Sequence, residues 1–422
     1  AEHIRHFGSS IPCANGMGSL LSAAGSCIGA CFGTCAFQSC VALLGCGTAS
    51  SPRAVSCVLV WLQAFAATLA LAMFYFGARW FPQFCSKLNV QLGVCECGMA
   101  TEVVGDCWRQ QLVIRAEASA VTVFSSLAVV SVSRCLRSGT LKFVLAKFLG
   151  VVLLYAVFLF LPNSLFTGFG DAASVASAAF LLGQMLAVIG FAYHWNDCWY
   201  HAALQAQRSL DTNVYVCHIA AMVTVAMALL TGAVATATWL YIVSPSSRAL
   251  ISGAMIAVFV LLLASITDYV KHGSLLASAV VTAYSAWTVY VAVGMSPAIP
   301  RSSPPIWLSL LITLSTIAMG MLTPEFDTKT VTFAPVVTGT STDSSSSESQ
   351  DASDHQDTVK GEPKFVVHCI MHIFAALYLT TAFVPTVGNV QYICHALAVF
   401  GGLLLYGWSL IAPMVLNSRD FG

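Results

Sequence analysis

Apolar segments that are each long enough to cross a lipid bilayer as one helix recur along most of the chain. A hydrocarbon core about 30 Å thick needs about 20 apolar residues at a helical rise of ~1.5 Å per residue. Proline, glycine, serine and charged residues separate the segments, as is typical of connecting loops. Ten ranges meet this criterion: Ala54–Ala78, Gln110–Ser133, Leu141–Leu161, Ala172–Trp199, Thr212–Ile242, Leu250–Thr267, Ser274–Met295, Ile306–Leu322, Phe365–Val384 and Val390–Val415.

The composition excludes a soluble globular protein. Of the 422 residues, 58% are hydrophobic and 9% are charged, and the mean hydropathy is +0.81. Soluble domains carry roughly 25% charged residues, and a membrane β-barrel would show short alternating segments instead. The net charge of zero gives no basis for binding nucleic acid. We therefore predict an all-α polytopic membrane protein of about ten transmembrane helices.

Four regions follow from this pattern. Residues 1–16 are an N-terminal extension without the apolar core of a secretory signal, and residues 17–322 hold a cysteine-rich segment and eight spans. Residues 323–364 form the long polar region, with eight acidic and three basic residues. Its composition is typical of a disordered, solvated linker, and a docking loop is the alternative. Residues 365–422 hold the last two spans and the C-terminus.

The distribution of Lys and Arg predicts the topology. If the ten spans alternate, one side of the membrane carries twelve of the 18 basic residues and the other side carries six. Because cytosolic loops are richer in Lys and Arg, we expect both termini to be cytosolic. Whether the protein resides in an endomembrane or in the plasma membrane is left open.

One polar loop, on the side predicted to be lumenal or extracellular, is rich in cysteine. Four cysteines allow three pairings, and an oxidising lumen favours two disulfides. Free thiols are the alternative, and a metal site is disfavoured because paired CxxC units are missing. The disulfide candidates are Cys85, Cys95, Cys97 and Cys107.

Glu117 and Lys147 are charged residues within predicted spans, where ionisable side chains are often functional. We expect Glu117 to face a polar cavity, while Lys147 has the alternative of extending its ammonium to the interface. Direct contact between them is not assured, because they lie at different depths. His368 and His372 share a helix face, and we expect core or interfacial roles rather than metal binding.

The fourth span, Ala172–Trp199, ends in a polar and aromatic cluster. The 23 residues from Ala172 to His194 give about 35 Å of helix, after which residues typical of a membrane interface follow. An acid at a helix C-terminus is unfavourable, so we expect a partner such as His201 or Arg208 for the acid of this cluster. The candidates for contact with a lipid headgroup are Trp195, Asn196, Asp197 and Trp199.

Three motifs resemble the serine incorporator (SERINC) family. The C-terminal segment Tyr406–Phe421 (YGWSLIAPMVLNSRDF) is similar to the ending of that family. The segment His194–Trp199 (HWNDCW) resembles the Trp-Asn-Glu-Ser-Trp motif after its long helix, and Met17–Ser22 resembles its N-terminus. The chain departs from the family at Asp197 and Cys198, which replace Glu and Ser, and at Cys369, where a histidine is expected.

This resemblance implies two helical subdomains divided by one long diagonal helix, here Ala172–Trp199. It also implies handling of membrane phospholipids, either by ATP-independent scrambling or by support of the synthesis of phosphatidylserine and sphingolipids. It implies no catalytic residues, cofactor or metal, and the chain carries no recognisable nucleotide-binding or hydrolase motif. We therefore expect a protein that is not an enzyme.

Two other functions remain open. The divergence from the family and the N-terminal extension are compatible with a structural subunit of a larger membrane complex in which lipid activity has been lost. A transporter of serine or other amino acids would require an ion site and broken helices, and the prolines inside the spans are too few to support it.

Overall fold

The computed structural model describes residues 52–77, 79–83, 95, 102–129, 141–208, 212–267, 274–296, 306–322, 362–384 and 389–415. Within these ranges the chain is helical and has no strand. The α-helices are α2 (Pro52–Ala72), α4 (Glu102–Val129), α5 (Leu141–Phe160), α6 (Thr167–Arg208), α7 (Thr212–Val243), α8 (Arg248–Ile266), α9 (Leu275–Gly294), α10 (Ile306–Leu322), α12 (Glu362–Phe383) and α13 (Asn389–Val415).

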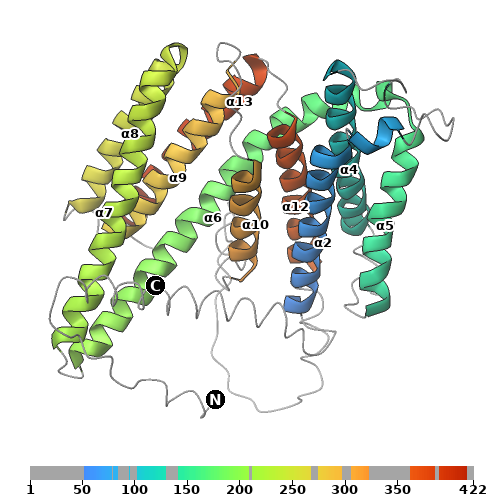
Figure 1. Ribbon diagram of the computed structural model, residues 1–422. Coiled ribbons are helices and arrows are strands. Elements are labelled where there is room, and N and C mark those ends of the chain that lie inside the picture. Colours follow the sequence, from blue (N-terminus) through green and yellow to red (C-terminus); the bar gives the residue numbers. More distant parts are fainter. Residues whose placement is uncertain are drawn as a thin grey trace, which may run out of the picture.

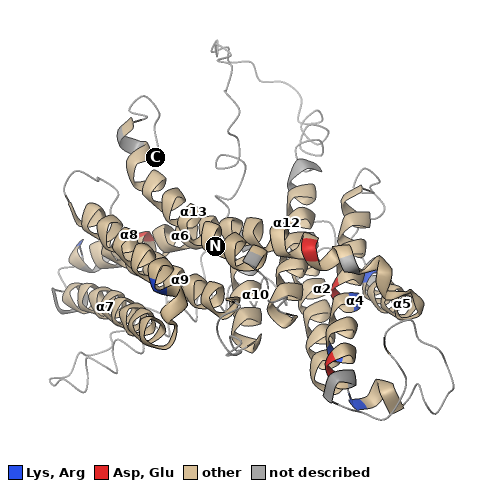
Figure 2. Cartoon of the chain, turned by 90° about the horizontal axis from the view of Figure 1, so that it is seen from above, with Lys and Arg blue, Asp and Glu red and all other residues tan. Residues whose placement is uncertain are grey.

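The described helices confirm an all-α polytopic membrane protein. Each of the ten predicted spans overlaps one helix, and eight of the described helices are long and apolar enough to cross a bilayer. The apolar parts of α5 and α10 are shorter. Figure 2 shows that charged residues are sparse along the helices, as expected for surfaces that contact lipid rather than water.

The helix α6 divides the molecule diagonally (Figure 1). On one side α12 packs against α4 and α2, and α5 packs against α4; we call these four helices the first bundle. On the other side α9 packs against α7, α8 and α13, which form the second bundle. The helix α6 contacts both bundles, and α10 packs against α6, α12 and α2. The two subdomains implied by the family resemblance are therefore present.

Small residues allow α13 to approach α6 closely. A Cβ atom added at Gly401 would lie 2.8 Å from Leu182 Cδ2, and one added at Gly402 would lie 3.0 Å from Met185 Cε. In a membrane, helices associate through close packing of this kind, because lipid tails are as apolar as the side chains. The two glycines thus fix the second bundle against the diagonal helix.

Two predicted helix boundaries were wrong. The second span was expected to begin at Gln110, but α4 begins at Glu102. The fourth span was expected to end at the polar cluster around Trp199, but α6 continues to Arg208 and is 42 residues long. The residues of the cluster are compatible with a helix, and tertiary contacts on both sides of α6 extend it beyond the apolar run.

Candidate functional site

The polar cluster His194–Trp199 lies within α6, and its aromatic residues pack against protein. Trp199 is buried, with 3% of its surface exposed, and Trp195 is partly buried. The Trp195 ring lies 5.5 Å from the Phe191 ring and 5.7 Å from the Trp199 ring, measured between centroids. The Trp199 ring therefore offers little surface to lipid, and its predicted contact with a headgroup stays a prediction.

Asn196 joins α6 to the start of α9. Its Oδ1 atom accepts a hydrogen bond from Ser274 Oγ at 2.6 Å, and Ser274 Oγ in turn accepts one from the backbone N–H of Ala277 at 3.2 Å. Ser274 is the N-cap residue of α9, and such caps satisfy an otherwise unpaired amide. Asn196 is thus already engaged within the protein.

Asp197 is the candidate of this cluster that remains exposed. The amide of Asn196 donates to its Oδ1 atom at 3.4 Å, and no ion pair with His201 or Arg208 occurs in the described part of the chain. The pair was expected because Asp197 was placed at a helix C-terminus. That placement was wrong, because α6 continues past Asp197 to Arg208. Beside it, the exposed Cys198 Sγ lies 3.7 Å from His194 Nε2. The role of the cluster in headgroup contact stays a prediction.

A row of exposed hydroxyl groups follows one face of α7. Thr224, Thr231 and Thr238 are seven residues apart and exposed, so they lie nearly above one another on the helix. Each hydroxyl donates a hydrogen bond to the carbonyl four residues earlier, at 2.7 to 2.8 Å. Such bonding of Thr to its own helix is common, and it leaves the hydroxyl oxygen as an acceptor. We call these three residues the threonine row.

The two intramembrane charges lie in the first bundle and do not pair with each other. Glu117 has no exposed surface, and 6% of the surface of Lys147 is exposed. No ion pair joins them among the residues that the structure describes. Neither carboxyl oxygen of Glu117 has a described hydrogen-bonding partner. The polar cavity expected around Glu117 stays a prediction.

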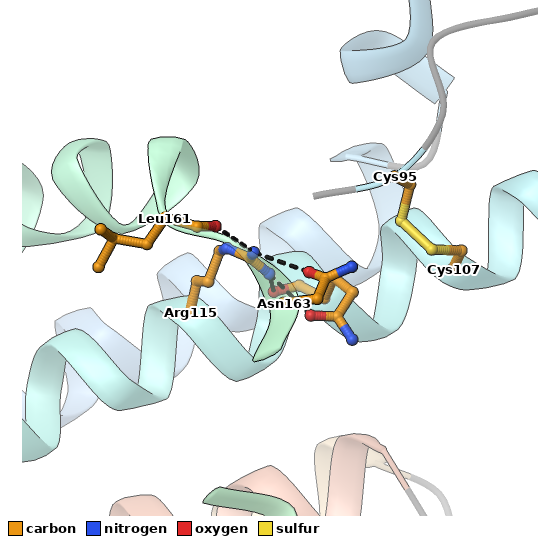
Figure 3. Close-up of a disulfide and its surroundings, with 6 residues drawn as sticks. Cys95, Cys107, Arg115, Leu161 and Asn163 are labelled. Carbon is orange, nitrogen blue, oxygen red and sulfur yellow. Dashed lines mark hydrogen bonds between the residues drawn. A yellow bond between two sulfur atoms is a disulfide. The ribbon is translucent and has the colours of Figure 1, made fainter. Parts of the chain in front are cut away.

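Arg115 is an important buried residue that sequence reasoning did not select as a site. It has no exposed surface, and its guanidinium binds the C-terminal end of α5 (Figure 3). Nε donates to Phe158 O at 2.8 Å, and Nη2 donates to Leu161 O at 3.0 Å. Nη2 also donates to Asn163 Oδ1 at 2.8 Å. Arg115 therefore caps α5, whose last carbonyls would otherwise lack donors.

Two further contacts hold the Arg115 guanidinium in place. Nη1 donates to Gln111 Oε1 at 2.7 Å, and the guanidinium lies 4.5 Å from the centroid of the Phe166 ring. The sequence contained a signal for this residue, namely an arginine inside an apolar run. Arg115 lies inside the predicted second span, Gln110–Ser133, but it was counted among the basic residues of the lumenal side and was not examined as a buried charge.

Cys95 and Cys107 are joined in the structure at the end of the first bundle (Figure 3), with a Cα–Cα distance of 6.3 Å. This is one arrangement compatible with the predicted disulfides. The other two candidates, Cys85 and Cys97, lie outside the described residues. Disulfide formation stays a prediction that peptide mapping tests.

The fold and these sites define a multi-pass helical membrane protein with a diagonal central helix and buried ionisable groups. The chain belongs to the serine incorporator (Serinc) family, whose model matches residues 26–370. This range includes α2 to the first part of α12 and the cluster His194–Trp199. The motifs Met17–Ser22 and Tyr406–Phe421 lie outside the matched range. Comparison with curated proteins gave no match.

Proposed function

We propose that this Serinc-family protein moves phospholipids between the two leaflets of a membrane without using ATP. The observation that carries the proposal is the threonine row of α7 together with the exposed Asp197 of α6. These helices run antiparallel and are joined by three residues. Asp197 lies about as far from the end of α6 at Arg208 as Thr224 lies from the start of α7 at Thr212. Both residues therefore lie at a similar depth.

The threonine row supports lipid movement because a headgroup crossing the bilayer needs polar contacts while its tails stay in lipid. From Thr224 to Thr238 the row extends over about 21 Å, at ~1.5 Å per residue, of a hydrocarbon core about 30 Å thick. The threonine oxygens accept hydrogen bonds from a headgroup ammonium. Asp197 supplies an exposed negative charge on the neighbouring helix toward the same end of the bundle, and we expect it to attract the same ammonium. On the predicted topology, this end is the cytosolic one.

The proposal is tested by reconstituting the full chain into liposomes that contain fluorescent phosphatidylserine and following its exposure to a membrane-impermeant quencher. We expect the wild-type protein to expose inner-leaflet lipid without ATP. The triple substitution of Thr224, Thr231 and Thr238 by Val should slow this exposure several-fold, and Asp197→Asn should slow it less. Thr68→Val is the matched control, because Thr68 is an exposed threonine of α2 with the same bond to its own helix.

Asp171→Asn controls for loss of an exposed acid of α6, because Asp171 lies near the opposite end of that helix. Wild-type liposomes that behave like protein-free liposomes would contradict the proposal. Equal rates for the wild type and the triple variant would remove the threonine row as the track. Support of serine-derived lipid synthesis is the second form of the proposal, and incorporation of labelled serine into cellular lipids measures it.

A structural subunit of a larger complex is the alternative, and the same face of α7 bears on it. Ala228 and Gly232 are exposed there, and a Cβ atom added at Gly232 would meet nothing within 4 Å. Small residues suit close packing against another membrane helix. Absence of lipid movement, together with stable co-purification of other membrane subunits, would favour this alternative.

A further inference from the structure

The first bundle contains three buried polar side chains whose terminal atoms have no hydrogen-bonding partner among the described residues. They are Gln63 of α2, Glu117 of α4 and His372 of α12, and none has exposed surface. In each of the three side chains, neither terminal polar atom has a hydrogen-bonding partner among the described residues. Buried polar groups nearly always have a partner, and internal water supplies it where protein does not. Six such atoms in one bundle therefore indicate a hydrated interior.

Glu117 and His372 face the same interface between α4 and α12. The His372 ring stacks on the Phe124 ring of α4, with centroids 4.9 Å apart and an interplanar angle of 13°. Phe124 follows Glu117 by seven residues, so both lie on one face of α4. The axial separation is about 10 Å at ~1.5 Å per residue, a distance that a short chain of waters spans. The two residues thus occupy successive levels of one interior.

The surrounding groups distinguish the two ends of this interior. From Val58 to Ala72, α2 contributes no ionisable side chain. Toward the start of α12, His372 is preceded by the buried Cys369 and by His368, and α5 contributes the buried Lys147. Beyond Glu117 lies Arg115, whose guanidinium is held by the end of α5. The other buried ionisable side chains on the described parts of α4, α5 and α12 are Tyr155 and Tyr378.

The chemistry of these groups points to a proton as the ligand. A carboxylate buried without a partner costs far more than a neutral carboxylic acid, so this position favours the protonated form. Chains of Glu and His within membranes commonly carry protons. Metal binding has less support, because the described residues include no group of three or more His, Cys, Asp or Glu suited to a metal ion.

We propose that Glu117 and His372 form an internal proton-binding site, hydrated beside Gln63 and reached from the end of the first bundle where α12 begins. The proton resides on the Glu117 carboxyl. When the O–H bond breaks, the proton leaves along water toward the end of the bundle where α12 begins and the carboxylate stays on Glu117. The neutral ring of His372 accepts a hydrogen bond from that water. The fixed positive charge of Arg115 closes the opposite end to protons, as cationic side chains do in other membrane pathways.

Infrared spectroscopy of the full chain reconstituted in phosphatidylcholine membranes tests this site across a pH series. We expect a carbonyl band of a protonated carboxylic acid that disappears as the pH rises and that is absent from Glu117→Gln. In His372→Phe, loss of the acceptor should move the disappearance of this band to higher pH by about one unit, the scale of coupling between interacting groups. The size of this shift in the pH at which Glu117 loses its proton measures the coupling between Glu117 and His372.

His395→Phe is the matched control, because His395 is also fully buried but lies in α13 of the second bundle. It should leave the band and its pH dependence unchanged. Identical spectra for the wild type and Glu117→Gln at every pH would overturn the proposal. So would a Glu117 band that His372→Phe does not shift, since Glu117 would then be an isolated buried acid. These measurements do not require lipid movement, so they are independent of the proposed scrambling activity.

Discussion

The two bundles on either side of α6 bury different kinds of polar group. The first bundle encloses a carboxyl group together with basic side chains, namely Glu117 with Arg115, Lys147 and His372. The described part of the second bundle encloses mainly hydroxyl groups, which bond to carbonyls of their own helices or to one another, and it buries His395 without a buried acid. The apolar exterior therefore covers two different interiors. The first bundle buries ionisable side chains, and in the second bundle neutral hydrogen bonds dominate.

A network of hydroxyl groups connects helices in the interior of the second bundle. Ser278 Oγ donates to Ser265 Oγ at 2.6 Å and lies 2.7 Å from Tyr406 Oη, so that α8, α9 and α13 are connected. A related contact reaches α6, where Gln184 Oε1 accepts from Tyr284 Oη at 2.8 Å. Satisfied neutral networks make packing specific without adding buried charge.

The largest effect that tests this contrast is expected at Arg115. Replacing Arg115 with Met removes the cap of α5 and its hydrogen bonds to several partly buried carbonyl and amide oxygens, each worth about 1–3 kcal/mol. We expect a loss of about 3 kcal/mol or more in the free energy of unfolding, measured by denaturant titration in detergent micelles. Arg109→Ala is the control, because its ion pair with Asp106 is exposed and worth about 1 kcal/mol or less. Similar losses in both variants would show that the buried cap adds nothing.

The Cys95–Cys107 link is the second test, because it closes the end of the first bundle beside α4. Peptide mapping without reduction should recover these two cysteines in one linked fragment. Cys107→Ser should then lower the free energy of unfolding by about 2–3 kcal/mol, as expected for closure of a short loop. Cys198→Ser is the control, because Cys198 is an exposed cysteine of α6 that takes no part in this link. Recovery of Cys95 as a free thiol from the native protein would contradict the pairing.

The smallest effect is expected in the second bundle. Tyr406→Phe removes one hydroxyl from the network with Ser278 but keeps the ring, so we expect a loss of about 1 kcal/mol, measured as in the Arg115 variant. Tyr200→Phe is the control, because the Tyr200 side chain is exposed on α6. A loss as large as that of Arg115→Met would erase the difference between the bundles.

The sequence predicted the helices well and their polar contacts poorly. Apolar length located all ten helices, because the cost of exposing backbone groups to lipid requires each long apolar run to be helical. It misplaced the end of α6, because the residues His194–Trp199 suit both a membrane interface and a buried helix. The hydrogen bond between Asn196 and Ser274, which are 78 residues apart, decides between these environments, and no local pattern reports it.

The buried polar groups show the same difference between what the sequence predicts and what tertiary contacts decide. The sequence marked Glu117 and Lys147 as unusual from their position in apolar runs, but pairing between them depends on helix rotation and depth. The role of Arg115 was missed because its partners Phe158, Leu161 and Asn163 are 43 to 48 residues away. The resemblance to the family implied the division by α6, whereas close packing at Gly401 and Gly402 shows how α6 holds the second bundle.

The sequence by itself determined that this protein is a bundle of membrane helices of the serine incorporator family, because apolar length and local motifs are properties of neighbouring residues. Only the tertiary structure decided which polar groups are paired and which are left to water. Pairing requires side chains from different helices to meet at one depth and one rotation. That geometry gave Arg115 a fixed structural role, engaged Asn196, and left Glu117 and His372 without described partners in one interior.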